Sequence, residues 1–111
     1  MKLWIDDVRP APEGYVWCKS INEAKRVIRA YEEDASYHWK NYGYVSTRMK
    51  IELIDIDHDA GEYASDGGDY IKLLDWLEET GRNYPIHIHS MNPVGVENMR
   101  RIIQRNGWKE I

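Results

Sequence analysis

The stretch that decides the fold reads Ile51-Glu52-Leu53-Ile54-Asp55-Ile56-Asp57-His58-Asp59-Ala60-Gly61. It opens as an apolar, β-branched run and ends in acids, a histidine and a glycine. Such a run between turn signals is typical of a buried strand in a parallel sheet, here residues 50–57. Because α/β proteins bind ligands where parallel strands end, the acids after the run predict a binding site at that edge.

Two other segments have the same form. Residues 2–6 make a short apolar strand candidate followed by Asp7, and residues 85–90 make another that ends in His89 and Ser90. The carboxyl ends of parallel strands lie on one edge of a sheet, so we expect all three ends to meet there. The result would be one acidic pocket that contains a histidine.

Apolar stripes at helical spacing separate these strands. They cover residues 24–31, 70–77 and 96–103, and glycines at 81 and 107 mark the ends of the last two helices. Residues of the type that cap helices precede each stripe. The expected N-caps are Ser20, then Ser65 or Asp66, and then Asn92.

The alternation of strands and helices predicts the architecture. Residues 14–18 read weakly as an additional extended segment, and residues 33–49 have no clear period. We interpret 33–49 either as containing a short edge strand at 45–49 or as an irregular insertion. The order predicts one α/β domain over residues 1–111, with a parallel sheet, right-handed crossovers and helices on both faces.

Composition narrows the class of protein. A chain of 111 residues is the size of one domain, and its formal charge of −4 indicates no surface for general nucleic-acid binding. Cys18 is the only cysteine, which excludes a disulfide framework within the chain and an all-cysteine metal site. No apolar run reaches membrane-spanning length and no signal peptide is evident, so we expect a cytoplasmic protein. The sequence leaves the oligomeric state open.

The motifs resemble the receiver domain of two-component response regulators, a flavodoxin-like fold. In that family an acidic pair follows the first strand, an aspartate follows the central strand, and a hydroxyl residue follows the next. The resemblance implies that Asp6, Asp7 and Asp57 hold Mg²⁺, that Asp57 accepts a phosphoryl group, and that Ser90 contacts it. The lysine that ends the fifth strand of a receiver has no clear counterpart, since Lys109 comes too late.

Three segments are more closely similar to a divergent receiver-like group. They are Trp4–Pro10, Asp57–Asp59 and His89–Gly95. This group has been proposed to process cyclic phosphates and suggested to act in RNA end repair. The resemblance therefore implies a phosphate-ester substrate, either a small molecule or an RNA end.

The resulting hypothesis is a metal-dependent phosphoesterase. Predicted ligands of one or two divalent cations, Mg²⁺ or Mn²⁺, are Asp6, Asp7, Asp57 and Asp59. The predicted catalytic residues are Asp57, Asp59 and His89, with His89 as proton donor to the leaving oxygen. Ser90 and Asn92 are predicted to bind phosphate at a helix N-terminus. Further candidates are Arg9, Asp55, His58 and His87.

Structural interpretations of the same residues remain open. Asp6 and Asp7 also suit a turn, paired with Arg9, and Asn92 suits a simple helix cap. His87 also fits a hydrogen-bonded core histidine. The alternative functions are a stand-alone receiver phosphorylated on Asp57 and a non-catalytic pseudo-receiver that serves as an interaction module.

Overall fold

The sheet is built around the strand that the 51–61 stretch predicts. In the computed structural model, which describes residues 1–111, β3 (Leu53–Ile56) pairs with β1 (Lys2–Ile5) on one side and β4 (Ile86–Ile88) on the other. Strand β2 (Tyr15–Cys18) pairs with the outer side of β1. The order is β2-β1-β3-β4 and every pairing is parallel, which confirms the receiver-like α/β fold.

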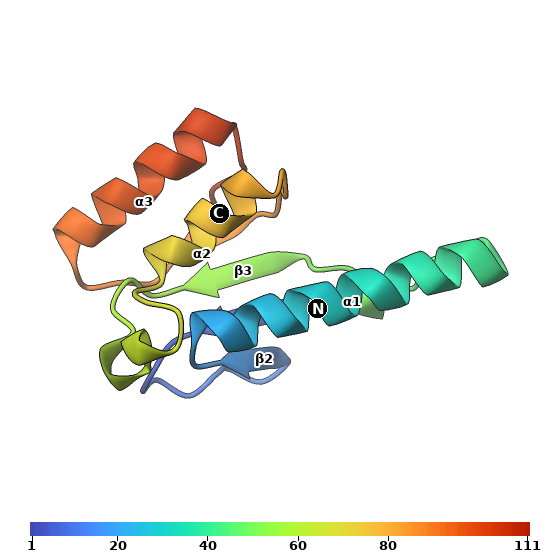
Figure 1. The fold of residues 1–111 in the computed structure, drawn as a ribbon, viewed down its shortest axis with the longest axis horizontal. Helices are drawn as coiled ribbons and strands as arrows, with labels where there is room; N and C mark the ends of the chain where they lie inside the picture. The colour runs from blue at the N-terminus through green and yellow to red at the C-terminus, as the bar shows by residue number, and fades with distance from the viewer.

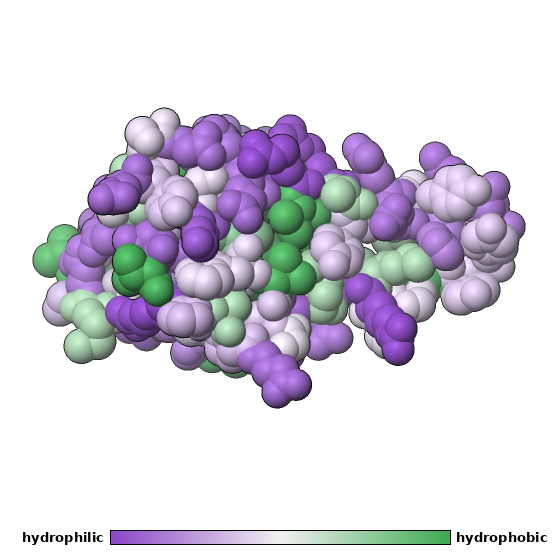
Figure 2. Space-filling view, turned by 90° about the horizontal axis from the view of Figure 1, so that it is seen from below, coloured by the Kyte–Doolittle hydropathy of each residue, from purple (hydrophilic) through white to green (hydrophobic).

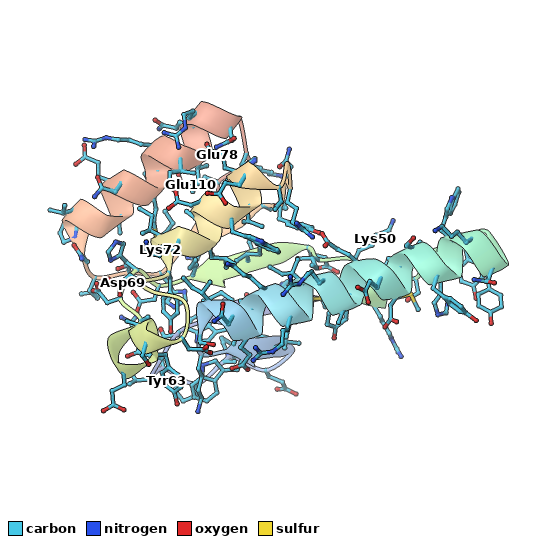
Figure 3. All side chains as sticks on the ribbon, viewed as in Figure 1. Lys50, Tyr63, Asp69, Lys72, Glu78 and Glu110 are labelled. Atoms are coloured by element: carbon cyan, nitrogen blue, oxygen red, sulfur yellow. The ribbon has the colours of Figure 1, made fainter.

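Three helices connect and follow these strands (Figure 1). They are α1 (Ile21–Tyr42), α2 (Ile71–Glu79) and α3 (Pro93–Asn106). Helix α2 lies between the other two. An ion pair between Glu78, which is labelled in Figure 3, and Arg105 links α2 to α3. As predicted, Ser20 caps α1, with its hydroxyl accepting a hydrogen bond from the amide of Glu23.

The core lies between the sheet and the helices. Alternate strand side chains point into it, and they are almost all aliphatic: Leu3, Ile5, Val16, Cys18, Ile54, Ile56, Ile86 and Ile88. Each helix adds an apolar stripe, such as Leu73, Leu74 and Leu77 of α2. Burial of these aliphatic groups is the main driving force that holds the helices against the sheet.

One detail differs from the expected architecture, in which helices cover both faces of the sheet. Here all three helices pack on the same face. Right-handed crossovers from β2 to β3 and from β3 to β4 run in one direction across the sheet, so their helices must lie on one side. The β1–β2 connection runs in the opposite direction, and residues 6–14 form a loop without a helix. The second face is therefore left without a helical layer.

The predictions for residues 33–49 were wrong. Helix α1 continues to Tyr42 and ends at Gly43, and a short 3₁₀ helix, η1 (Thr47–Met49), replaces the edge strand. The last turns of α1 extend beyond the body of the molecule, whose extents are 45 × 29 × 23 Å (Figure 2). The end of this helix carries exposed aromatic residues and makes no apolar stripe, which is why its period was not visible in the sequence.

The predicted cap of α2 was also wrong. Residues Gly61–Ser65 form a 3₁₀ helix, η2, and α2 begins only at Ile71 after Tyr70. Asp66 instead accepts hydrogen bonds from Ser20 Oγ at 2.6 Å and from Asn22 Nδ2 at 2.9 Å. It therefore ties the loop after β3 to the start of α1.

The chain ends beside β4. Trp108 is buried, and the amide of Ile86 donates to the carbonyl of Lys109 in an isolated parallel bridge between Ile86 and Glu110. This pairing covers the outer edge of β4. No helix is both long enough and apolar enough to cross a membrane.

Candidate metal and phosphate site

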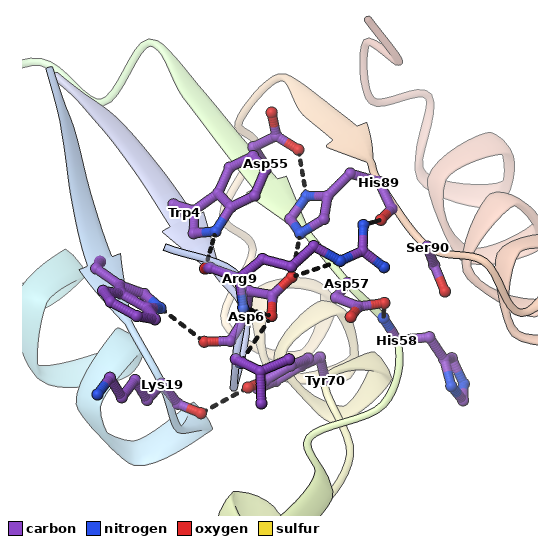
Figure 4. A network of polar contacts seen from close by, with 12 residues as sticks. Trp4, Asp6, Arg9, Lys19, Asp55, Asp57, His58, Tyr70, His89 and Ser90 are labelled. Carbon is purple, nitrogen blue, oxygen red and sulfur yellow. Dashed lines mark hydrogen bonds and ion pairs between the residues drawn. The ribbon is translucent and has the colours of Figure 1, made fainter. Parts of the chain in front are cut away.

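The ends of β1, β3 and β4 bring together a carboxylate, a second carboxylate and an imidazole (Figure 4). Ligand atoms of Asp6, Asp57 and His89 all lie within 4.8 Å of one another. Asp6 is fully buried and Asp57 is 8% exposed. The convergence predicted from the strand order is therefore present, and the three side chains sit on one edge of the parallel sheet.

His89 is held between two carboxylates. Its Nδ1 lies 2.6 Å from Asp55 Oδ1 and its Nε2 lies 2.9 Å from Asp6 Oδ2. Burial lowers the pKa of His89, but the hydrogen bonds and charges of Asp55 and Asp6 outweigh it, so the pKa is raised above its usual value. Without a metal, the imidazolium is thus the cation that neutralises this part of the site.

Asp6 is fixed by its own loop as well as by His89. Its Oδ1 accepts from the amides of Val8 at 3.0 Å and Arg9 at 2.9 Å, as in an Asx turn. Burial raises the pKa of Asp6, but the hydrogen bonds from these amides and the contact with His89 lower it by more, so the net shift is downward. The turn interpretation of Asp6 is confirmed through Oδ1, and the other oxygen, Oδ2, contacts His89.

Trp4 and Arg9 cover the histidine. The Trp4 ring stacks on the His89 ring with a centroid distance of 3.8 Å and an interplanar angle of 3°. Arg9 donates from Nη1 to the carbonyl of His89 at 3.1 Å, and its Nε lies 3.8 Å from Asp6 Oδ2. The sequence interpretation missed Trp4, although its position two residues before Asp6 places it on the same side of β1.

Asp7 lies beside the same acids. Burial and the charges of Asp6 and Asp57 raise its pKa, although its own backbone amide partly opposes this. The loop after β3 passes close to it at Gly61, where φ is +55° and an added Cβ would lie 2.4 Å from Asp7 Oδ2. Glycine is therefore required there for both its conformation and its size.

Asp59 and His58 form a separate pair at the rim. Asp59 is 62% exposed at its side chain, and its Oδ1 lies 2.9 Å from His58 Nδ1 rather than with Asp6 and Asp57. The His58 ring packs against α3, where a Cβ at Gly95 would lie 2.4 Å from it. The backbone amide of His58 donates to Asp57 Oδ1 at 2.7 Å.

The N-terminus of α3 provides groups that suit a phosphate. The side-chain oxygen of Asn92 caps the helix by accepting from the amide of Gly95 at 3.0 Å. The backbone N–H of Asn92 donates to Ser90 Oγ at 3.1 Å. Ser90 therefore keeps its hydroxyl hydrogen free to donate, and the amide of Val94 is one of the first-turn amides that lack an intrahelical acceptor. A cavity of about 550 Å³ opens beside Ser90 and continues along α3 to Arg100.

The structure also places the two remaining candidates, Asp55 and His87. Asp55 is the partner of His89, as described above, whereas His87 lies on the uncovered face with Nδ1 2.9 Å from the carbonyl of Ile111. Tyr70, missed as a site neighbour, donates from its hydroxyl to the carbonyl of Lys19 at 2.6 Å. Burial and the nearby charges of Asp7, Asp6 and Asp57 raise its pKa, so this hydroxyl stays protonated.

The residues present fit a divalent cation. Two buried carboxylates and an imidazole are a donor set that transition metals and Mn²⁺ accept, and Asp57 has only the hydrogen bond from the His58 amide. Asp55 bound to Nδ1 corresponds to the carboxylate that commonly orients a metal-binding histidine. Asp6, Asp57 and His89 would hold the metal, with Asp7 beside them.

The family comparison agrees with this geometry. A family model described as the cyclic-phosphate processing receiver domain matches residues 1–105, which include all four strands and nearly all of α3. Comparisons with curated proteins and with solved structures gave no match. Because the match extends over almost the whole chain and contains the three strand ends that form the site, this chain belongs to the cyclic-phosphate processing receiver domain family.

Proposed function

We propose that this chain is a metal-dependent phosphoesterase that hydrolyses a cyclic phosphate ester, with the 2′,3′-cyclic phosphate of an RNA end as its substrate. The observation that carries the proposal is the cluster of Asp6, Asp57 and His89 within 4.8 Å, beside the N-terminus of α3. The family description supports the substrate class. Conventional receiver signalling requires no imidazole at this position.

Each group has a distinct role in this proposal. A divalent cation held by Asp6, Asp57 and His89 would neutralise charge on the phosphoryl oxygens and lower the pKa of a bound water. Ser90 and the amide of Val94 bind the remaining phosphate oxygens, as a helix N-terminus does for anions. Asp55 orients the His89 ring. Hydrolysis adds water across one P–O ester bond and leaves a phosphate monoester.

Turnover and metal binding test the proposal together. The purified chain with Mn²⁺ or Mg²⁺ is given adenosine 2′,3′-cyclic phosphate, and phosphorus NMR follows the monoester product. Metal affinity is measured separately by calorimetry and by the rise in melting temperature, which is expected because a ligand of the folded state stabilises it. Asp57→Asn should lose both activity and metal binding. Asp34→Asn, which removes the same charge from the exposed part of α1, should lose neither.

His89→Asn separates the two roles considered for the histidine. If His89 is a ligand together with Asp6 and Asp57, metal affinity and turnover should fall together. If it is only a proton donor, turnover should fall by roughly 10²- to 10⁴-fold with metal affinity retained. Absence of turnover on cyclic, monoester and diester phosphates with either metal would refute the phosphoesterase proposal.

A second function is a stand-alone receiver that is phosphorylated on Asp57. The position of Asp57, buried at the end of β3 and next to Asp6, favours it. Incubation with a small phosphodonor such as acetyl phosphate, followed by mass spectrometry, would then show a phosphorylated Asp57. Phosphorylation without turnover of any ester would assign the switch in place of the esterase.

A further inference from the structure

The two faces of the sheet differ in chemistry. The face under the helices is aliphatic, as described above, whereas the uncovered face carries aromatic, basic and polar side chains. Alternation along the paired strands assigns to it Lys2, Trp4, Tyr15, Trp17, Leu53, Asp55 and His87. Leu53 is its only aliphatic residue. A face built to receive another helix would be rich in Val, Ile and Leu, as buried sheets with helices on both sides are.

The aromatic rings are fixed at the edge that carries the acids. Trp4 and Trp17 are register partners on β1 and β2. The indole N–H of Trp17 donates to the carbonyl of Asp6 at 2.8 Å, and that of Trp4 donates to the carbonyl of Arg9 at 2.8 Å. Tyr15 packs edge-on against Trp4 with centroids 5.9 Å apart. The rings are thus preorganised and adjoin the His89–Asp6 pair.

Cations accompany the rings although the chain as a whole is acidic. Lys19 Nζ lies 4.5 Å from the centroid of Trp17, and Lys2 Nζ lies 5.5 Å from the centroid of Tyr15. Arg9, whose side chain is 44% exposed, donates from Nη1 to the carbonyl of His89, and its own carbonyl accepts from the indole of Trp4. Rings next to cations match a ligand that is both planar and anionic.

We propose that this face is a stacking platform for the nucleobases of a single-stranded nucleotide chain whose terminal phosphate lies at Asp6, Asp57 and His89. Aromatic side chains on an open sheet, next to basic residues, are the groups that proteins use to stack single-stranded bases. The lysine over Trp17 is no obstacle, because a partly exposed cation–π contact is typically weaker than a base stacked on indole.

The platform rests on the proposed function only for the position of the phosphate; the stacking itself is independent of hydrolysis. It also explains how an acidic chain could act on a nucleic-acid end. Three cations, Lys2, Lys19 and Arg9, would contact the backbone, so binding should be local and only moderately dependent on salt. The expected slope of log K against log salt is about −2.

Binding of a short labelled RNA tests the proposal. Fluorescence anisotropy measures the affinity of the wild-type chain for a six-nucleotide single strand that ends in a 2′,3′-cyclic phosphate. The measurement is made without metal, in EDTA, and again with Mn²⁺. Trp17→Leu keeps apolar volume but removes the stacking ring, and it should weaken binding by roughly 5- to 100-fold. Lys19→Gln should make the salt slope shallower by about 0.7. Trp39→Ala changes a tryptophan that is 64% exposed on α1, and it should leave affinity unchanged.

Base-free glycerol 1,2-cyclic phosphate distinguishes the two proposals. If RNA binding depends on Trp17 while no ester is hydrolysed, the platform stands and the esterase fails. If glycerol cyclic phosphate is hydrolysed while Trp17→Leu and wild type bind RNA equally, the platform is overturned and the esterase stands. Absence of RNA binding, or a chain that sedimentation shows to dimerise through this face until Trp17 is replaced, also overturns the platform.

Discussion

At the scale of single residues, the site is defined by one histidine between two carboxylates. Asp55 and Asp6 contact opposite nitrogens of His89, and Trp4 covers its ring. A buried imidazolium between two acids is a satisfied arrangement, whereas either acid alone would be a costly buried charge. Binding of a metal through His89, as proposed, would therefore require loss of this proton, since a metal ligand must be neutral imidazole.

His89 should make the metal-free protein less stable as the pH rises. Its pKa in the folded state is raised above the ordinary value of 6.5, so its contribution is complete below that value and is lost as the pH passes through the folded pKa. Melting temperatures in EDTA should therefore fall as the pH rises above 6.5. The fall should be smaller in Asp55→Asn and absent in His89→Gln. An identical fall in His89→Gln would show that another group is responsible.

Gly61→Ala should destabilise the chain more than Gly14→Ala. Both glycines have left-handed φ values, +55° and +85°, but only the Cβ at 61 would meet Asp7, at 2.4 Å, while the one at 14 would meet nothing within 4 Å. We expect Gly14→Ala to cost about 1 kcal/mol from backbone strain. Gly61→Ala should cost up to about 3 kcal/mol more, because the carboxylate must move. Chemical denaturation of both variants measures the difference, and equal costs would contradict the close approach.

At the scale of elements, helix α1 has two different halves. The first half is anchored by buried Ile21, Ala24 and Ile28, and by the Ser20 cap that also bonds Asp66. The second half lies mostly in solvent, where Tyr37, Trp39 and Tyr42 are more than half exposed. Local helix formation and the Gly43 end, rather than burial of an apolar face, hold this part.

Hydrogen exchange should separate these halves. Amides of residues 35–42 open by local unfolding, so their opening free energy should be close to zero. Residues 24–31 pack on the core through Ala24, Val27 and Ile28, so their amides should exchange only through opening events of much higher free energy. Exchange followed by NMR at each residue gives both values. Equal protection along all of α1 would indicate that the second half is covered, for example by a partner or a second copy.

At the scale of the whole molecule, the fold has to be stable with helices on only one face of the sheet. The C-terminal residues contribute to this. Trp108 is 8% exposed in the core, and the segment after it pairs with β4. The short chain therefore depends on contacts between residues that are far apart in sequence.

Trp108→Ala should remove much of the free energy of unfolding. Replacing a buried tryptophan costs about 3–5 kcal/mol, which is a large part of the 5–15 kcal/mol typical of a domain. We expect a fall in melting temperature of more than about 10 °C. Trp39→Ala is the matched control, because its side chain is 64% exposed and surface changes usually stay within about 0.5 kcal/mol. Equal melting of the two variants would refute the role of Trp108 in the core.

The amino-acid sequence alone predicts the strands, their parallel arrangement and the edge of the sheet where the candidate site lies. These follow from local rules: apolar runs that end in acids, stripes at helical spacing, and caps such as Ser20 and Asn92. Asp6, Asp57 and His89 could be placed together for the same reason, since each follows a strand and parallel strands end on one edge. The family resemblance, confirmed over residues 1–105, rests on the same positions.

Which side chains these residues contact became clear from the three-dimensional arrangement. Asp55 contacts His89, and Asp59 contacts His58, because register and loop path set which side chains meet. The length of α1 could not be read, since its second half lies mostly in solvent and carries no apolar stripe. The uncovered face was likewise invisible, because it follows from the direction in which each connection crosses the sheet, a property of the whole topology and of no single segment.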